Sequence, residues 1–252
     1  MKSMILRVSI VILFFSLWEL LPTVGVVNPN FLTPVSGVLK ALRGLLLSGE
    51  LITHLMISLK RILFGLGLAI VIGCPLGIIM GWFRSLEMTI DAPLQAGRQV
   101  SALALFPVFI LFFGIGEISK VIIIFWASVW SVLLNTVAGV KNIDPLLIKS
   151  ARSFGAKGTT LFRKVILPAI APSIFTGIRL GASYAFMVLV AAEMIGANSG
   201  LGFLILNSQE VFKIPEMYAG IVALGLFGLI VNNILLAFEK QNTGWKEARD
   251  TE

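Results

Sequence analysis

Few residues of this 252-residue chain could take part in catalysis or metal binding. The sequence holds one cysteine, Cys74, and one histidine, His54. Cys74 lies inside an apolar stretch and has no second cysteine with which to form an intrachain disulfide. Two soft ligands are too few for a structural zinc site or for a cysteine–histidine nucleophile pair. We therefore expect no catalytic residue and no bound metal ion.

Nucleotide-binding motifs are also missing from the sequence. The P-loop pattern G-x-x-x-x-G-K-[ST] does not occur, and the nearest string, GAKGTT at residues 155–160, lacks its spacing and follows no strand. The patterns G-x-G-x-x-G, H-E-x-x-H and G-x-S-x-G do not occur either. We expect that the chain is not an enzyme and does not itself bind ATP through a P-loop.

The composition is that of a membrane protein. Hydrophobic residues make up 57% of the chain and charged residues 13%, whereas a soluble domain has roughly 25% charged residues. A soluble core of this size cannot bury so much apolar surface. The net charge of +7 could indicate nucleic-acid binding in a soluble protein, but in a membrane protein it reflects cationic cytoplasmic loops. We therefore expect membrane lipid, and no nucleic acid, around this chain.

The apolar stretches predict the spans, since a helix needs about 20 apolar residues to cross a bilayer. Six stretches reach or approach this length: residues 4–21, 62–82, 100–115, 121–140, 174–196 and 217–238. No small-x-small cleavage site follows the first, so we take it as a retained span and not a secretory signal. The third is the weakest because it is short and contains Pro107. We predict one all-α polytopic membrane domain over residues 1–252, with six transmembrane helices.

Basic residues predict the orientation of these spans. If the N-terminus is cytoplasmic, the inside segments hold 14 of the 20 Lys and Arg residues and the outside segments hold 6. This bias favours cytoplasmic N- and C-termini. It also places residues 141–173, between the fourth and fifth spans, in the cytoplasm.

Glycines in the second span form a pattern of their own. Gly73, Gly77 and Gly81 recur every four residues and share one helix face, where the missing side chains let another backbone approach closely. We expect this face to pack against another helix.

Polar groups within the spans are candidates for function. Glu193 lies near the outer end of the fifth span, where an ionisable group tends to face the bundle interior or water. It could line a path or gate, or it could be a buried partner of a backbone amide or of a base such as Arg61. An ionised Glu193 would repel an anion, so we favour the structural or gating role. The other polar groups at this depth could bind a substrate or could join helices by hydrogen bonds, and joining helices is the commoner role. These groups are Asn135, Ser183, Tyr184, Asn232 and Asn233.

Residues 141–173 carry the most informative pattern in the chain. Asp144 and Pro145 predict a helix start, because the carboxylate can accept backbone N–H groups and proline suits the first turn. Apolar residues follow at helical spacing, and Gly155 can take a positive φ at the helix end.

A second short helix is expected from Thr159 or Thr160 until Pro168 ends the pattern. The two helices are joined by Gly-Ala-Lys-Gly and carry exposed apolar residues such as Phe154. These helices therefore need another surface against which their apolar residues can be buried.

At these residues the sequence resembles the permease subunits of bacterial ABC importers. The signature of that family is EAA, three residues, Gly, nine residues and I-x-L-P. The chain reproduces the spacing with KSA at 149–151, Gly155 and VILP at 165–168. Lys149 and Ser150 replace the signature Glu and Ala, so the role of that glutamate is not carried over.

Further strings resemble the nitrate, sulfonate, taurine and bicarbonate group of these permeases, and the likeness covers roughly residues 18–238. They are FGIGE at 113–117, LNT at 134–136 with GV at 139–140, DP at 144–145, and AEMIGA at 192–197 with GLG at 200–202.

The resemblance implies a permease of the bacterial cytoplasmic (inner) membrane, paired with a second permease copy as a homodimer. A separate cytoplasmic ATP-binding cassette ATPase dimer would hold ATP-Mg and drive transport, and this chain would bind no cofactor. An extracytoplasmic solute-binding protein would deliver a small anion such as sulfonate, taurine, nitrate or bicarbonate.

In such a permease, the first helix of the 141–173 loop is a coupling helix that sits in a groove of the ATPase. The resemblance implies these residues for ATPase coupling: Ser150, Ala151, Arg152, Phe154, Gly155, Ala156, Lys157, Leu161 and Pro168. The candidates for the translocation path or gate are Asn135, Ser183, Tyr184 and Glu193.

Other functions stay open at this point. The same family includes importers of thiamine precursors and other organic solutes. A carrier driven by an ion gradient would often show inverted repeats and a charged pair at the midplane, and neither is evident in the sequence. An intramembrane enzyme would need a nucleophile and a base within the spans, which the single His54 at a span entrance does not supply.

Overall fold

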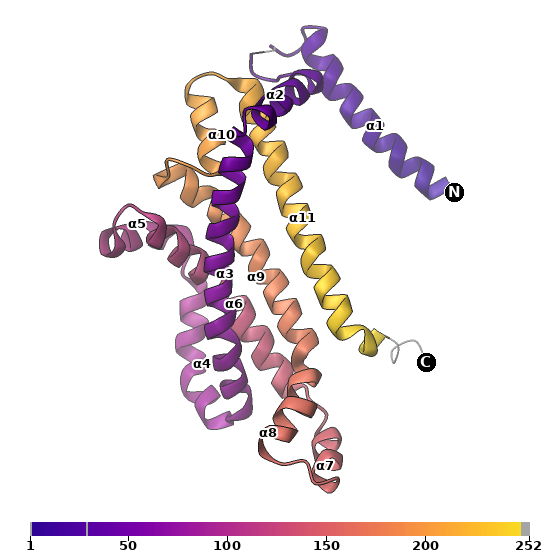
Figure 1. The fold of residues 1–252 in the computed structure, drawn as a ribbon, viewed down its shortest axis with the longest axis vertical. Coiled ribbons are helices and arrows are strands. Elements are labelled where there is room, and N and C mark those ends of the chain that lie inside the picture. The colour runs from indigo at the N-terminus through magenta and orange to yellow at the C-terminus, as the bar shows by residue number, and fades with distance from the viewer. Residues whose placement is uncertain (1, 29, 248–252) are drawn as a thin grey trace. The chain divides into compact units, whose positions relative to one another are not determined.

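The computed structural model describes residues 2–28 and 30–247. Every regular element in these ranges is a helix, which confirms the all-α fold class (Figure 1). In chain order the elements are α1 Lys2–Thr23, α2 Val35–Leu47, α3 Glu50–Trp82, α4 Arg84–Gln99, α5 Ala102–Phe113, α6 Glu117–Lys141, α7 Pro145–Ser153, α8 Gly158–Leu161, a π-helical stretch Phe162–Ile166, α9 Leu167–Gly196, α10 Leu201–Glu210 and α11 Ile214–Glu247.

Several helices have the length and composition of membrane spans. Within the described residues, four qualify: Glu50–Trp82, Glu117–Lys141, Gly158–Gly196 and Ile214–Asn242. A fifth arises if Met88–Gln99 and Ala102–Phe113, which meet at a 93° bend, form one broken span. Ser9–Thr23 is a shorter apolar helix. A helical membrane protein is thus supported, whereas the number of six spans and their orientation stay predictions.

The chain forms two compact units. The first comprises Met1–Ser58 with Glu193–Phe227, and the second comprises Leu59–Ala192 with Gly228–Glu252. The long helices α3, α9 and α11 contribute residues to both. The prediction of a single domain over residues 1–252 stays a prediction.

In the first unit, α1 and α2 are joined by polar contacts. The Glu19 carboxylate accepts hydrogen bonds from the hydroxyl and the backbone N–H of Ser36, at 2.7 and 3.0 Å. The Trp18 indole N–H donates to the Thr33 carbonyl oxygen at 3.0 Å. Tyr218 of α11 packs its ring against Trp18, so these contacts connect α1 and α2 with the start of α11.

In the second unit, α3 packs on α6 through its glycine face. A Cβ added at Gly77 would lie 2.8 Å from the Leu133 carbonyl oxygen and 2.7 Å from the Thr136 Cβ. Gly73 and Gly81, four residues to either side, approach α6 in the same way. Because helices in lipid gain little from burying apolar surface against each other, close backbone packing of this kind is what stabilises the pair.

Helix α9 packs on α6 by the same means. A Cβ at Gly177 would lie 3.0 Å from the Ser131 carbonyl oxygen, and one at Gly139 would lie 2.6 Å from the Ser173 Cβ. The buried Ser128 hydroxyl donates to the carbonyl oxygen of Gly181 at 3.1 Å. Helix α6 is therefore held closely on two sides.

Replacing Gly77 with Leu should destabilise the protein, because the added side chain has no space between α3 and α6. We expect a loss of about 1–3 kcal/mol, seen as a lower melting temperature in detergent. The matched control is Gly67→Leu on the same helix, where an added Cβ meets no atom within 4 Å. Equal melting temperatures for the two variants would contradict this packing.

Candidate functional site

The first candidate site is the segment between α6 and α9, which begins with a capped helix. The Asp144 carboxylate accepts a hydrogen bond from the backbone N–H of Leu146 at 2.8 Å, and Pro145 is the first residue of α7. Gly155 follows the helix with φ +83°, a left-handed conformation that suits glycine. The predicted start and end of this helix are both confirmed.

The second helix of the segment does not end where the sequence suggests. Pro168 is the second residue of α9, so the expectation that it terminates the helix is wrong. The five π-helical residues Phe162–Ile166 precede it, and the Leu167 N–H bonds to the Phe162 carbonyl oxygen, one residue further back than in an α-helix. This change of hydrogen-bond register directly before the proline lets the helix continue through a residue that has no N–H.

One side of the segment is anchored in its own unit. Leu161 is 6% exposed and belongs to an apolar cluster, here called the loop core, with Val140, Ile143, Ile166 and Ile170. Ala151 and Ala156 pack against the loop core and are partly buried. Leu161 thus packs with residues of α6 and α9, and its predicted role in ATPase coupling stays a prediction.

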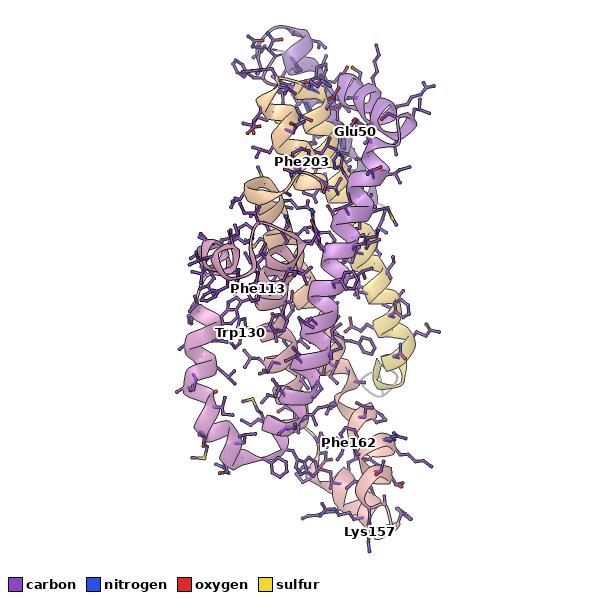
Figure 2. All side chains as sticks on the ribbon, turned by 60° about the vertical axis from the view of Figure 1, so that its left-hand side comes forward. Glu50, Phe113, Trp130, Lys157, Phe162 and Phe203 are labelled. Carbon is purple, nitrogen blue, oxygen red and sulfur yellow. The ribbon has the colours of Figure 1, made fainter. Side chains whose placement is uncertain are left out.

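The opposite side of the segment is open. No residue of α7 is buried, and the Phe154 side chain, which follows it, is 92% exposed. Ser150, Arg152 and Gly155 are exposed too, as is Lys157 at the tip of the segment (Figure 2). An exposed aromatic ring rimmed by basic groups is typical of a surface that binds another protein.

The second candidate site is the carboxylate of Glu193 in the first unit. This side chain is fully buried, with 0% exposure. The Ser58 hydroxyl donates to its Oε1 at 2.8 Å, and the backbone N–H of Gly202 donates to its Oε2 at 2.8 Å. This arrangement fits the expectation of a buried partner for a backbone amide, and a role in gating stays a prediction.

Neighbouring side chains accept hydrogen bonds from the backbone N–H groups of the two residues that precede Gly202. The Leu201 N–H donates to the Ser58 Oγ at 2.9 Å, and the Gly200 N–H donates to the His54 Nδ1 at 3.0 Å. Gly200 has φ +113°, and a Cβ there would overlap the Glu193 carboxylate. Three consecutive N–H groups at the start of α10 are therefore held by side chains of α3 and α9. No pattern in the sequence indicated that Ser58 and His54 contact this turn, and the only related signal was the G-L-G string of the turn itself.

Arg61, considered above as a partner of Glu193, forms an ion pair in the second unit. Its Nε and Nη2 atoms donate to the two carboxylate oxygens of Glu117 at 2.7 and 2.6 Å. Lys120 lies 3.8 Å from the same carboxylate and donates to the carbonyl oxygen of Gly116. These contacts attach the start of α6 to α3.

The third candidate site is a cavity of about 570 Å³ in the second unit. Asn135 and Tyr184, both expected on the translocation path, line it, together with Arg98, Trp126 and Trp130. Two other path candidates, Ser183 and Glu193, are not among its lining residues. Within the described ranges, no group of three or more His, Cys, Asp or Glu side chains is placed to hold a metal ion.

Comparison with known proteins gives consistent matches along the chain. Residues 73–242 match the family described as binding-protein-dependent transport system inner membrane component. The chain is 37% identical over 251 residues to a putative ABC transporter permease protein of Methanocaldococcus jannaschii. The aligned region covers 98% of this chain and 94% of that protein.

Two further relatives carry names that mention a cargo. The putative aliphatic sulfonates transport permease protein SsuC of Bacillus subtilis is 34% identical over 249 residues, 98% of this chain and 88% of the relative. The taurine transport system permease protein TauC of Escherichia coli is 32% identical over 249 residues, 97% of this chain and 90% of the relative.

Glu193→Gln should lower the melting temperature of the protein. A glutamine amide group must face either the Ser58 hydroxyl or the Gly202 N–H, so one buried donor loses its acceptor, at a cost of about 1–3 kcal/mol. Glu210→Gln, at an exposed position of α10, is the matched control. Unchanged stability together with lost transport would refute the structural role and favour gating.

Proposed function

This chain belongs to the family of binding-protein-dependent transport system inner membrane components, and we propose that it is the permease subunit of an ATP-driven importer of small anions. Its relatives named for aliphatic sulfonates and taurine support a sulfonate as the cargo. The family description and the four membrane-capable helices support a location in the membrane, which we propose to be the bacterial cytoplasmic membrane.

In this proposal the chain crosses the membrane six times. Ser9–Thr23 is the first span, and the bent pair Met88–Gln99 and Ala102–Phe113 is the third, interrupted at its 93° bend. Both termini lie in the cytoplasm, as the distribution of basic residues favours. The segment 141–173, with α7 and α8, then faces the cytoplasm.

The exposed ring of Phe154 is the observation that carries the coupling role. A short helix with a free apolar side and basic neighbours offers a surface for a groove of a separate ATPase subunit. Phe154 is the apolar anchor, and Ser150, Arg152 and Lys157 form its polar rim. The ATPase dimer binds and hydrolyses ATP-Mg, since this chain carries no P-loop motif.

The loop core would transmit the movement of the ATPase. Ala151 of α7 packs against the loop core, as do Ala156 and Leu161 further along the segment, so a shift of α7 would be passed on to α6 and α9. Protein interiors resist deformation, and closure of the ATPase dimer would therefore move α6 and α9 as rigid bodies between inward-open and outward-open states. A second copy of the chain completes the pore, and an extracytoplasmic solute-binding protein delivers the cargo.

Phe154→Ala should separate the permease from its ATPase without unfolding it. The ring is 92% exposed, so its loss leaves the melting temperature unchanged, whereas removal of a central anchor lowers association about tenfold or more. The amount of ATPase that co-purifies with the tagged permease measures this effect.

The control is Phe64→Ala, which removes an exposed ring from α3, 68% exposed and outside the segment. Full co-purification of the ATPase with the Phe154→Ala variant would contradict the coupling role. Uptake by the wild type that continues without ATP, while an ion gradient is maintained, would indicate a secondary carrier instead.

A further inference from the structure

The turn between α10 and α11, at residues 211–213, has an unusual backbone (Figure 1). The Phe212 N–H donates to the Gln209 carbonyl oxygen at 3.1 Å, and the Lys213 N–H donates to the Ser208 carbonyl oxygen at 2.8 Å. Together these bonds form a Schellman motif, in which the residue at the position of Phe212 has a positive φ and is usually glycine. Phe212 has φ +57°, and among the described residues it is the only one other than glycine with a positive φ.

The ring of Phe212 does not offset the cost of this conformation by packing within the chain. A side chain in the left-handed region crowds the backbone, which glycine avoids. The Phe212 side chain is nevertheless 84% exposed, and the neighbouring Val211 is 54% exposed. Residues held in sparsely populated backbone regions cluster at functional sites. The turn therefore presents an aromatic ring for a contact outside this chain.

The rest of the first unit holds the turn in place. Leu204 of α10 is 2% exposed, and a Cβ added at Gly220 of α11 would lie 2.9 Å from the Ile205 Cγ1, so the two helices pack closely. The opposite end of α10 is bonded to side chains of α3 and α9 through the N–H groups of residues 200–202. Because the turn is already formed, a partner that binds it does not bear the cost of ordering it.

Polar groups of both charge signs surround the two apolar side chains. Gln209, Glu210 and Lys213 are exposed, and the Lys213 Nζ lies 3.4 Å from the Glu216 carboxylate. An apolar centre with a polar rim is the usual arrangement of a protein–protein interface. A surface of anionic lipid would repel Glu210 and Glu216, so these charges favour a protein over the membrane surface as the partner.

The proposed topology places the turn outside the cell. Helix α9 leaves the cytoplasmic segment 141–173 and crosses the membrane. Helix α10, which follows, has 10 residues. At 1.5 Å per residue it covers about 15 Å, half of the hydrocarbon thickness, and so it does not cross back before the turn. The description of the family names a binding protein on which transport depends, and that protein acts on the extracytoplasmic side in the proposed function.

We propose that the turn at residues 211–213 docks the solute-binding protein, with Phe212 as the apolar anchor and Glu210 and Lys213 in the rim. The binding protein then carries an apolar pocket for one ring, flanked by charges of both signs. The inference rests on the proposed function, because it gives the binding protein of that importer a contact site on named residues.

The test uses the permease–ATPase complex in proteoliposomes and the purified solute-binding protein that supports ATP-dependent uptake by the wild type. ATP hydrolysis is followed as the concentration of the binding protein is raised. Phe212→Ala removes the anchor and should raise the half-maximal concentration about tenfold or more, with an unchanged rate at saturation.

Phe212→Gly separates docking from folding. Glycine suits the left-handed backbone, so the melting temperature of this variant should equal or exceed that of the wild type. Its half-maximal concentration should nevertheless rise as in Phe212→Ala. A merely structural role of Phe212 predicts normal docking in the glycine variant. Phe64→Ala is the matched control, because its ring is 68% exposed but lies within the span Glu50–Trp82.

A photoreactive benzophenone amino acid in place of Phe212 identifies what the ring contacts, and it should crosslink the added binding protein. Crosslinks to lipid alone or to a second copy of the permease would overturn the inference, as would wild-type half-maximal concentrations in both Phe212 variants. Either result leaves the importer intact, because the wild type still takes up its cargo. Absence of ATP-dependent uptake by the wild type with any binding protein would instead overturn the proposed function, and the docking site with it.

Discussion

Close backbone packing of α6 against α3 and α9 holds the second unit together. Lipid tails are as apolar as leucine side chains, so helices in a membrane gain little from burying apolar surface against each other. Small residues solve this problem by letting backbones approach. Gly77 on α3, and Gly139 and Gly177 at the contact of α6 with α9, occupy places where a methyl group would overlap the neighbouring helix. These contacts hold α6 in a fixed position.

Helix α6 connects the features that the proposed function needs. Its last turn reaches the loop core through Val140, and Ile143 follows just after the helix, while its middle carries Trp126 and Trp130 in the cavity wall. In the proposed function, a movement that begins at α7 would pass along α6 toward the cavity. Tight packing favours such discrete movements over gradual deformation.

How much of this could be read from the sequence differs from feature to feature. The start of α7 at Asp144 and its end at Gly155 depend on local hydrogen bonds and backbone angles, and the sequence predicted both. The passage of α9 through Pro168 depends on a π-helical stretch that no sequence pattern indicated. Helical spacing placed Leu161 among the apolar residues but could not show that it faces its own chain.

The contacts of Glu193 and the wall of the cavity were harder to predict because their residues come from distant parts of the chain. Ser58 and Glu193 are 135 residues apart, and only the fold brings them together. The cavity combines Arg98, the two tryptophans and Tyr184, which belong to α4, α6 and α9. The sequence singled out Tyr184 as a polar group within a span, but the tryptophans counted there only as apolar residues.

In the proposed function, a separate ATPase holds α7 and Phe154. The most direct measurement is site-specific crosslinking in native membranes from a Phe154→Cys variant, in a background where Cys74, the only cysteine, is replaced by Ser. We expect one major crosslinked product, which contains a nucleotide-hydrolysing subunit and forms only while that subunit is present. A crosslinker at this position that reacts only from the extracytoplasmic side, or that captures no ATPase, would contradict the claim.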